Sequence, residues 1–328
     1  MKFRNFAGRS IAMGLGAVAV AALAAPTAAK AEYPEKPITV MVGFAAGGGV
    51  DTYARTVAGL IQDHIGQPMV VVNKPGAAGM IAARATVDAE PDGYTLYVTN
   101  TGSLLAKAMM DGEKSKLDPI TDLTPIAGIG QLVTALVVQE DSPFKSAADV
   151  VKAARENPGS LKWAHPGRGS LHMIGGAAFL AANRIKARDI PFKGGSTARN
   201  AIVGGQVDFG FVGIQLLSGF EGKLRALGVT IDERDPVNND VPTFSEQGLE
   251  GIDISGLMMM LGHPDIPQDV RAKLSDATAK VIASQEFKDL AAKAGISAFF
   301  FDAETAATRL KKLKTNLEPV IAEIKNQK

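Results

Sequence analysis

The chain of 328 residues contains no cysteine, so neither disulfides nor thiolate ligands are available to it. It has only four histidines, and none is paired with an acidic residue at the spacing of a metal motif. We therefore predict no metal site. A chain without disulfides must be held together by its hydrophobic core, and this length suits two lobes.

Motifs for binding nucleotides are also missing. A P-loop requires a lysine after its glycines, and none follows the glycine run that ends at Gly49. A dinucleotide fingerprint requires an acidic residue on the next strand, whereas Met69–Val72 leads into Asn73 and Lys74. No run of like charge occurs, so nucleic-acid binding has no electrostatic support. We expect no cofactor and no nucleic-acid partner.

The first residues have the three parts of a secretory signal peptide: positive charge, an apolar run and a small-x-small cleavage site. These parts are Lys2, Arg4, Arg9, Ile11–Ala25 and Ala29-Lys30-Ala31. We predict a signal peptide over residues 1–31, cleaved near Ala31, and hence a periplasmic protein. The alternative is an uncleaved membrane anchor, for which the apolar run is short. Cleavage removes four basic residues and no acidic one, which changes the formal net charge from +1 to −3.

The most informative stretch is a strand, a glycine loop and a helix in succession. Ile38–Val42 is rich in β-branched residues, which predicts a buried strand. The first glycine loop, Gly43–Gly49, follows it. From Asp51, a natural N-cap or first-turn acid, apolar residues recur with helical spacing. These residues are Tyr53, Val57, Leu60 and Ile61.

This arrangement favours anions. The first N–H groups of a helix have no partner within the helix, and its dipole places partial positive charge there. Glycines let a ligand's oxygen atoms approach the backbone closely. The loop therefore suits a carboxylate, phosphate or sulfate. A tight turn that binds nothing explains the loop alone equally well.

Further along the chain, predicted strands alternate with predicted helices, which indicates an α/β fold with mostly parallel pairing. Two more glycine loops open helices: the second glycine loop, Gly167–Ser170, and the third, Gly194–Thr197. A polar cluster, Thr99–Ser103, ends another predicted strand, where ligands of open α/β sheets bind. Two further apolar strands are predicted at Leu132–Val138 and Ile252–Leu261.

Nine motifs occur in one order along the chain. They are Tyr33-Pro34-x-Lys36-Pro37-Ile38, Gly47-Gly48-Gly49-x-Asp51, the run from Gly66-Gln67-Pro68 to Lys74-Pro75-Gly76-Ala77, Pro91-Asp92-Gly93-Tyr94-Thr95-Leu96, Gly169-Ser170-x-His172, Phe192-Lys193-Gly194-Gly195, Gly204-Gly205-Gln206-Val207-Asp208, Gly222-Lys223-Leu224-Arg225-Ala226-Leu227, and Asp240-Val241-Pro242-Thr243 with Glu246-x-Gly248. Over essentially the whole mature chain, this series resembles the extracytoplasmic solute-binding proteins of tripartite tricarboxylate transporters, also called Bug proteins.

The resemblance implies a type II periplasmic-binding-protein fold: two α/β lobes joined by two crossover strands, with a ligand cleft between them. We place the first lobe at residues 32–131 plus 254–328 and the second at 132–253. The family captures small organic anions, mostly carboxylates, and delivers them to membrane permease subunits. We expect a monomer that is not an enzyme.

The resemblance also implies where the ligand lies. Backbone amides of the first glycine loop would hold the carboxylate, facing a loop of the second lobe. We hypothesise that the N–H groups of Ala46, Gly47 and Gly48 do most of this, aided by Ser170. The candidate ligand-binding residues are Phe44, Ala45, Ala46, Gly47, Gly48, Asn100, Thr101, Ser103, Gly169, Ser170, Thr197 and Val212.

Two positions depart from the family pattern. Val212 stands where many members have an aspartate, which would weaken binding of a ligand ammonium group. The run Met258–Met260 stands where an aromatic residue is common. Three methionines could form an adaptable wall of the cleft, but alternate residues of a strand face opposite sides, and we favour ordinary core packing.

Two other functions stay open. The pair Ser170 and His172 suggests a secreted hydrolase, but residues two apart at a helix start do not face each other, so no triad is indicated. Ser170 is better explained as a helix cap or a ligand donor. A ligand-loaded signalling partner of a membrane sensor kinase has the same sequence features as a transport receptor.

Overall fold

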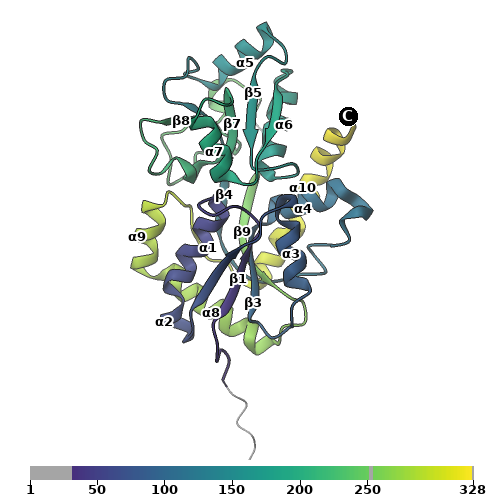
Figure 1. Ribbon diagram of the computed structural model, residues 1–328, viewed down its shortest axis with the longest axis vertical. Coiled ribbons are helices and arrows are strands. Elements are labelled where there is room, and N and C mark those ends of the chain that lie inside the picture. Colours follow the sequence, from purple (N-terminus) through teal and green to yellow (C-terminus); the bar gives the residue numbers. More distant parts are fainter. Residues whose placement is uncertain (1–31, 251–253, 327–328) are drawn as a thin grey trace, which may run out of the picture.

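The computed structural model describes residues 32–250 and 254–326. The predicted signal peptide lies outside the described residues. The chain folds into two α/β lobes, which lie one above the other in Figure 1. Long central strands connect them.

The first lobe is built on three parallel strands, β1 (Ile38–Val42), β2 (Met69–Asn73) and β3 (Thr95–Asn100), in the order β2-β1-β3. Branched and aromatic side chains of β1 and β3 are almost fully buried. The helices of this lobe are α1 (Gly49–Leu60), α2 (Gln62–Ile65), α3 (Met80–Val87), α4 (Thr101–Asp111), α8 (Gln268–Ala283) and α9 (Gln285–Lys293), with 3-10 turns η1 (Ala77–Gly79) and η2 (Gly112–Ser115).

Two antiparallel strands link the lobes, β4 (Thr124–Gln139) and β9 (Ser255–Gly262). β9 pairs with β3 of the first lobe and with the first part of β4. The last part of β4 pairs with strands of the second lobe. The 16-residue strand β4 therefore runs through both lobes.

The second lobe contains β5 (Lys162–His165), β6 (Arg188–Pro191), β7 (Phe209–Gly213) and β8 (Leu224–Val229). The sheet order runs β4-β7-β5-β6, and β8 pairs with the other edge of β4. Its helices are α5 (Ala147–Glu156), α6 (Leu171–Ala182) and α7 (Gly195–Val203), with 3-10 turns η3 (Ile214–Leu217) and η4 (Ser245–Gln247).

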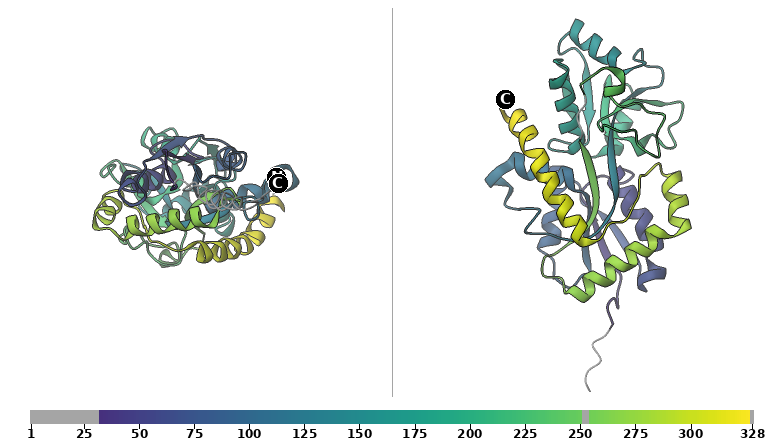
Figure 2. Two further views of the ribbon diagram at one scale, coloured as in Figure 1. Left: turned by 90° about the horizontal axis from the view of Figure 1, so that it is seen from below. Right: turned by 180° about the vertical axis from the view of Figure 1, so that it is seen from behind.

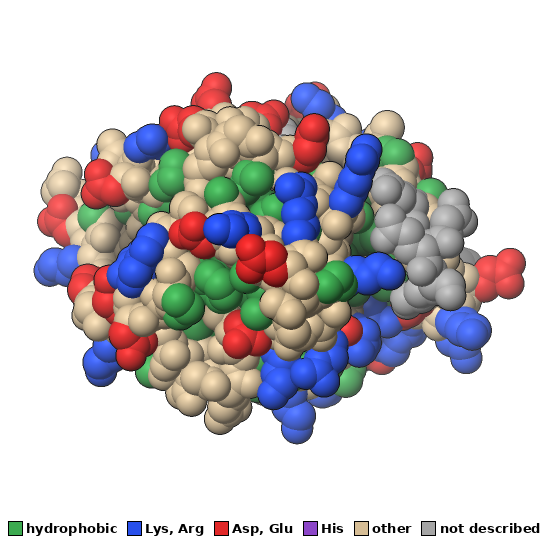
Figure 3. All heavy atoms as spheres, turned by 90° about the horizontal axis from the view of Figure 1, so that it is seen from above, with side chains coloured by type: hydrophobic (Ala, Val, Ile, Leu, Met, Phe, Trp, Pro, Cys, Tyr) green, Lys and Arg blue, Asp and Glu red, His purple; other side chains and the backbone are tan. Residues whose placement is uncertain are grey.

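The last helix, α10 (Ala303–Asn326), starts in the first lobe and runs along the back of the molecule towards the second (Figure 2). It packs against α4, β4 and α6. None of the helices in the described residues is long and apolar enough to cross a membrane. On the end of the second lobe, acidic, basic and apolar side chains lie interspersed (Figure 3).

The expectation of mostly parallel pairing is wrong, because the crossover strands run antiparallel to their neighbours. In the described residues four strand pairs are parallel and four antiparallel. The crossover strand also begins earlier than predicted, at Thr124 rather than Leu132. The first half of this strand contains glycines, which have a low strand propensity, so the sequence did not indicate a strand there. The glycines leave room for another segment to pack closely, because a Cβ on Gly128 would lie 2.0 Å from the Phe301 ring.

One local prediction, core packing of the methionine run, is confirmed, and the start of one helix shows its sequence signature. Ser146 and Asp149 form both bonds of a capping box at the start of α5. Met258, Met259 and Met260 are at most 1% exposed. Met258 and Met260 pack in one core cluster and Met259 in another, so the run belongs to the core on both faces of β9 and forms no wall of a cleft.

Candidate ligand-binding site

A small cavity of about 20 Å³ lies between the lobes. This is room for about one water molecule, so the lobes are closed on each other. No lining side chain carries a formal charge. The lining residues are Phe44, Gly48, Gly49, Val50, Asn100, Ser103, Leu132, Pro166, His172, Gly195, Gln215 and Leu216.

Four helices present their N-terminal ends to this cavity. Residues of the first turn or cap of α1, α4, α6 and α7 all contribute to the lining. The first two helices belong to the first lobe and the other two to the second. Since each N-terminus carries partial positive charge, the cavity favours an anion although no cationic side chain lines it.

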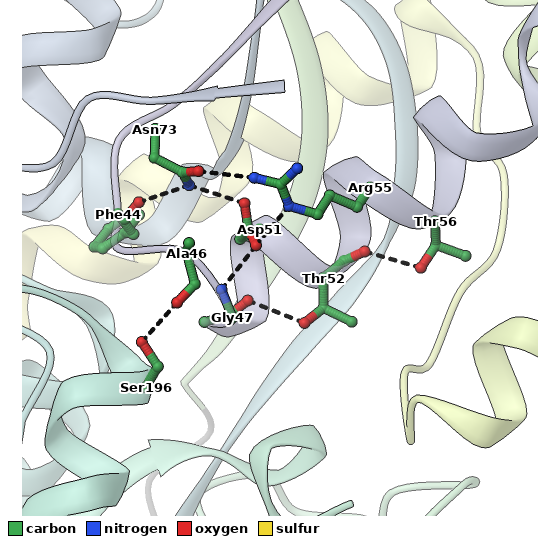
Figure 4. Close-up of polar contacts among 10 residues, drawn as sticks. Phe44, Ala46, Gly47, Asp51, Thr52, Arg55, Thr56, Asn73 and Ser196 are labelled. Carbon is green, nitrogen blue, oxygen red and sulfur yellow. Dashed lines mark hydrogen bonds and ion pairs between the residues drawn. The ribbon is translucent and has the colours of Figure 1, made fainter. Parts of the chain in front are cut away.

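The first glycine loop is held in shape from within its own lobe (Figure 4). Gly48 is the N-cap of α1, and Asp51 is the third residue of the helix rather than its cap. The buried Asp51 carboxylate accepts hydrogen bonds from Gly47 N (2.8 Å), Arg55 Nε (2.9 Å) and Asn73 Nδ2 (2.8 Å). Asp51 thus fixes the turn and does not line the cavity.

This network shows which of the loop amides in the hypothesis already have acceptors within the protein. Gly47 N is bound to Asp51, and Gly48 N donates to Ala45 O at 3.2 Å. Ala46 and Gly47 are exposed at the loop tip. The amides of Gly49 and Val50 have no acceptor among the described residues, and both residues line the cavity. The amides of Gly49 and Val50 are therefore better placed than those of Gly47 and Gly48 to meet a ligand in the cavity.

Two hydrogen bonds join the lobes beside the cavity. Ser196 Oγ, in the first turn of α7, donates to Ala46 O at 2.9 Å (Figure 4). Leu171 N, the first residue of α6, donates to Ser103 Oγ at 2.9 Å. The third glycine loop lies against the first, so that a Cβ on Gly194 would come within 2.9 Å of Ala45 N.

Two buried side-chain amides at the cavity lack partners. Asn100 Nδ2 and Gln215 Nε2 have no hydrogen-bond acceptor among the described residues. The other end of the Asn100 amide is fixed, because its Oδ1 accepts from Ser103 N at 3.1 Å and caps α4. An unsatisfied buried donor is costly and calls for an acceptor.

His172 adds a neutral imidazole to the lining. Its Nδ1 lies 2.6 Å from Thr134 Oγ1, in a buried pair. Burial, with a smaller contribution from nearby His165, lowers the pKa of His172 from 6.5 to about 3. The Thr134 hydroxyl can donate to Nδ1, which leaves Nε2–H as a further donor.

The cavity brings together four of the predicted site residues: Phe44, Gly48, Asn100 and Ser103. The other eight lie outside its lining. Three of them have hydroxyls with partners in the protein: Thr101 donates to Leu257 O, the exposed Thr197 donates to Gly194 O, and the fully buried Ser170 caps α6 through Met173 N. Val212 is fully buried in the core of the second lobe, and Gly169 lies against Lys107. Ala45, Ala46 and Gly47 form the tip of the first glycine loop.

Gln215 is not among the residues predicted from the sequence, and His172 was considered there only as half of a hydrolase pair. Gln215 lies in η3, just after β7, at a position where polar residues of α/β sheets meet ligands. That signal was present in the sequence but was weak beside the glycine loops. Among the described residues, no group of three His, Cys, Asp or Glu side chains could hold a metal ion.

Comparison with known proteins gives the family. The model of the tripartite tricarboxylate transporter family receptor matches residues 53–325. The chain belongs to this family. A curated relative, the UPF0065 protein in the tcbD-tcbE intergenic region of Pseudomonas sp. (strain P51), is 31% identical over 80% of this receptor and 79% of its own length. Protein BugT of Bordetella pertussis is 31% identical over 70% of this receptor and 71% of its own length.

Among solved structures, MatC from Rhodopseudomonas palustris with bound malate superposes on this receptor with a TM-score of 0.80 and 28% identity, covering 88% of this chain and 100% of that one. The fold is thus that of periplasmic solute-binding proteins, with two lobes as the sequence predicted.

Proposed function

We propose that this receptor is a periplasmic binding protein that captures a small organic carboxylate in the cavity between its lobes and delivers it to the permease of a tripartite transporter. One observation carries the proposal: four helix N-termini and two unpartnered buried amides surround one cavity. An anionic acceptor would satisfy both features at once.

Neutral donors suffice for such a ligand. Hydrogen bonds to a charged acceptor contribute about 1.5–3 kcal/mol each, roughly twice the value for neutral pairs. Backbone N–H groups and amides can hold a carboxylate without the desolvation cost of burying a cationic side chain. The two basic residues on nearby loops agree with a site that is made of neutral donors. Arg168 is paired with Asp189 at 2.8 Å and Lys193 is exposed, so neither lines the cavity.

The geometry argues against hydrolysis at Ser170 and His172. Ser170 Oγ accepts a hydrogen bond from Met173 N, and its side chain is fully buried. His172 Nδ1 is bound to Thr134 instead of an orienting carboxylate. A triad needs a base that reaches the nucleophile and an acid behind the base, and neither contact is present here.

The relatives support the ligand class. MatC, whose structure resembles this one, has bound malate, which is a carboxylate. The family name supports the permease as the partner, and the predicted leader supports export. Purified protein lacking residues 1–31 should be screened by thermal shift against mono- and dicarboxylates. Saturating ligand at about 100 times its Kd should stabilise the protein by about 2.7 kcal/mol. No stabilisation by any carboxylate, with stabilisation by another class of solute, would refute the proposal.

A further inference from the structure

The cavity carries more information about its ligand than the charge alone. Its two unpartnered amides come from opposite lobes: Asn100 ends β3 of the first lobe, and Gln215 lies in η3 of the second. Asn100 is 1% exposed and Gln215 is 6% exposed. Each is therefore a buried polar group whose missing partner must come from outside the chain or from trapped water.

Glycines make room for both amides. A Cβ on Gly49 would lie 1.9 Å from Gln215 Nε2, and a Cβ on Gly256 would lie 2.0 Å from Asn100 Nδ2. Gly49 belongs to the first lobe, so the Gln215 amide reaches across the lobe boundary to the start of α1. Only glycine at these two positions leaves the amides where they are. The two glycines of the backbone thus determine where the two amides can lie.

The remaining walls are apolar. Phe44, Val50, Leu132 and Leu216 complete the lining together with backbone and neutral polar groups. Once the amides and helix N-termini hold one carboxylate, a second carboxylate in this space would meet the apolar side chains. Burying a charge without a partner is costly. The lining therefore suits one charged group with a short apolar or weakly polar remainder.

The space also limits length. The closed cavity holds about 20 Å³, and the lobes are joined by the Ser196–Ala46 and Ser103–Leu171 hydrogen bonds. Any carboxylate is larger than this space and parts the lobes, and a compact one parts them least. A long dicarboxylate parts them furthest and strains these bonds most, which removes part of the gain on closure.

We propose that the side-chain amides of Asn100 and Gln215, one from each lobe, form an amide pair that donates hydrogen bonds to one carboxylate of the ligand. The receptor thereby selects compact monocarboxylates over long dicarboxylates. This rests on the proposed function, since it names the ligand class within the same cavity. Closure brings the second amide to the ligand, so the pair favours the ligand that holds the lobes apart least.

The first experiment compares ligands by calorimetry on the wild-type protein. The probes are propionate and pyruvate as compact monocarboxylates, malate as a short dicarboxylate and adipate as a long one. We expect propionate or pyruvate to bind at least 10-fold more tightly than adipate. Tighter binding of adipate would overturn the selection by size and charge while leaving carboxylate binding intact. If none of the four probes binds, both the selection and the proposed function fail for this ligand class.

The second experiment tests the amides with the tightest of these probes. Gln215→Leu removes one donor, and Asn100→Asp keeps the cap on α4 while replacing the other donor with an anionic oxygen. Each should weaken binding roughly 10- to 100-fold, the loss expected for hydrogen bonds to a charged group. Gln206→Leu, at an exposed position of the same lobe as Gln215, is the control.

Melting temperatures separate binding from folding in these variants. Asn100→Asp keeps the acceptor of Ser103 N, so a fall in its melting temperature measures the cost of the buried carboxylate, while Gln215→Leu carries no such charge. If both variants fold and bind the probe as tightly as wild type does, the amide pair is wrong although the receptor binds carboxylates. If Gln206→Leu weakens binding as much as Gln215→Leu, the effect is not specific to the cavity, and the pair is equally refuted.

Discussion

The first and third glycine loops look alike in sequence, yet they differ in which of their donors are free. Each precedes a helix whose N-cap is a glycine with no side-chain cap bond, Gly48 for α1 and Gly194 for α7. The third helical residue differs. In α1 it is Asp51, which accepts from the loop amide of Gly47, whereas in α7 it is Thr197, which donates to the Gly194 carbonyl.

The residue at the third position of the helix therefore determines whether an N–H group of the preceding loop is bound or free. The acid ties up the N–H group of Gly47 and makes the first loop a rigid support, and the N–H groups of Gly49 and Val50 are left at the cavity. The threonine takes no N–H group, so the first turn of α7 stays open. A glycine count cannot distinguish the two cases, but the residue three positions after the cap can.

The largest effect should come from removing the acid. Asp51→Ala takes away the acceptor of Gly47 N, Arg55 Nε and Asn73 Nδ2 at once. We expect the free energy of unfolding to fall by about 2–4 kcal/mol, because a buried hydrogen-bond network is broken. Chemical denaturation measures this.

The matched change in the third glycine loop is Thr197→Val, which removes one exposed hydroxyl bond. It should cost at most about 1 kcal/mol. Equal losses in the two variants would show that the loops are supported in the same way, and the contrast drawn here would fail.

The next largest effect should come from Gly49, at the end of the first glycine loop, which leaves the space for the Gln215 amide. Gly49→Ala puts a methyl group where the Gln215 amide lies, and that amide is the free end of a flexible side chain. We expect ligand affinity to fall roughly 10-fold or more, with a small change in stability, because the side chain can move away at the expense of its donor.

Gly59→Ala is the control within the same helix. Nothing lies within 4 Å of the added methyl group, so it should stabilise the protein by about 0.5–1 kcal/mol through helix propensity and leave affinity unchanged. Affinity unaffected by Gly49→Ala would mean that Gln215 takes no part in binding.

Much of the fold follows from local patterns, but the site follows only in part. The first strand, its loop and its helix were predictable from β-branched residues, glycines and helical spacing. The sequence did not show which loop amides are free. It indicated that Asp51 is a first-turn acid, but the bonds of Asp51 to Arg55 and Asn73 depend on the neighbouring strand. Gln215 stayed hidden because only the closed lobes bring it to Gly49.

A smaller effect is expected at the contact between the two loops. Ser196→Ala removes the hydrogen bond to Ala46 O that joins the lobes. If the bond forms on closure, affinity should fall about 2- to 10-fold, the equivalent of one neutral hydrogen bond. Ser160→Ala, which loses a hydroxyl bond to Asn157 O within one lobe, should leave affinity unchanged. Loss of affinity in the control alone would contradict this role.

The smallest effect on affinity should come from pH. Since burial lowers the pKa of His172 to about 3, the imidazole stays neutral and affinity should be flat between about pH 5 and 8. Stability behaves differently. The unfolded state binds the proton first, so the free energy of unfolding should fall as pH drops below 6.5 towards 3. His172→Gln should reduce that slope, and a sharp change of affinity near pH 6.5 would contradict a neutral imidazole.

The central claim is that neutral donors from both lobes hold the ligand. Nuclear magnetic resonance on ¹⁵N-labelled protein tests it directly, by titration with the tightest carboxylate found in the screen. The account predicts that the Asn100 and Gln215 side-chain amides and the backbone amides of Gly49 and Val50 shift together and saturate with the binding curve. Saturation with these four signals unchanged, and with shifts confined to Arg168 and Lys193, would show a side-chain clamp at the rim and contradict the account.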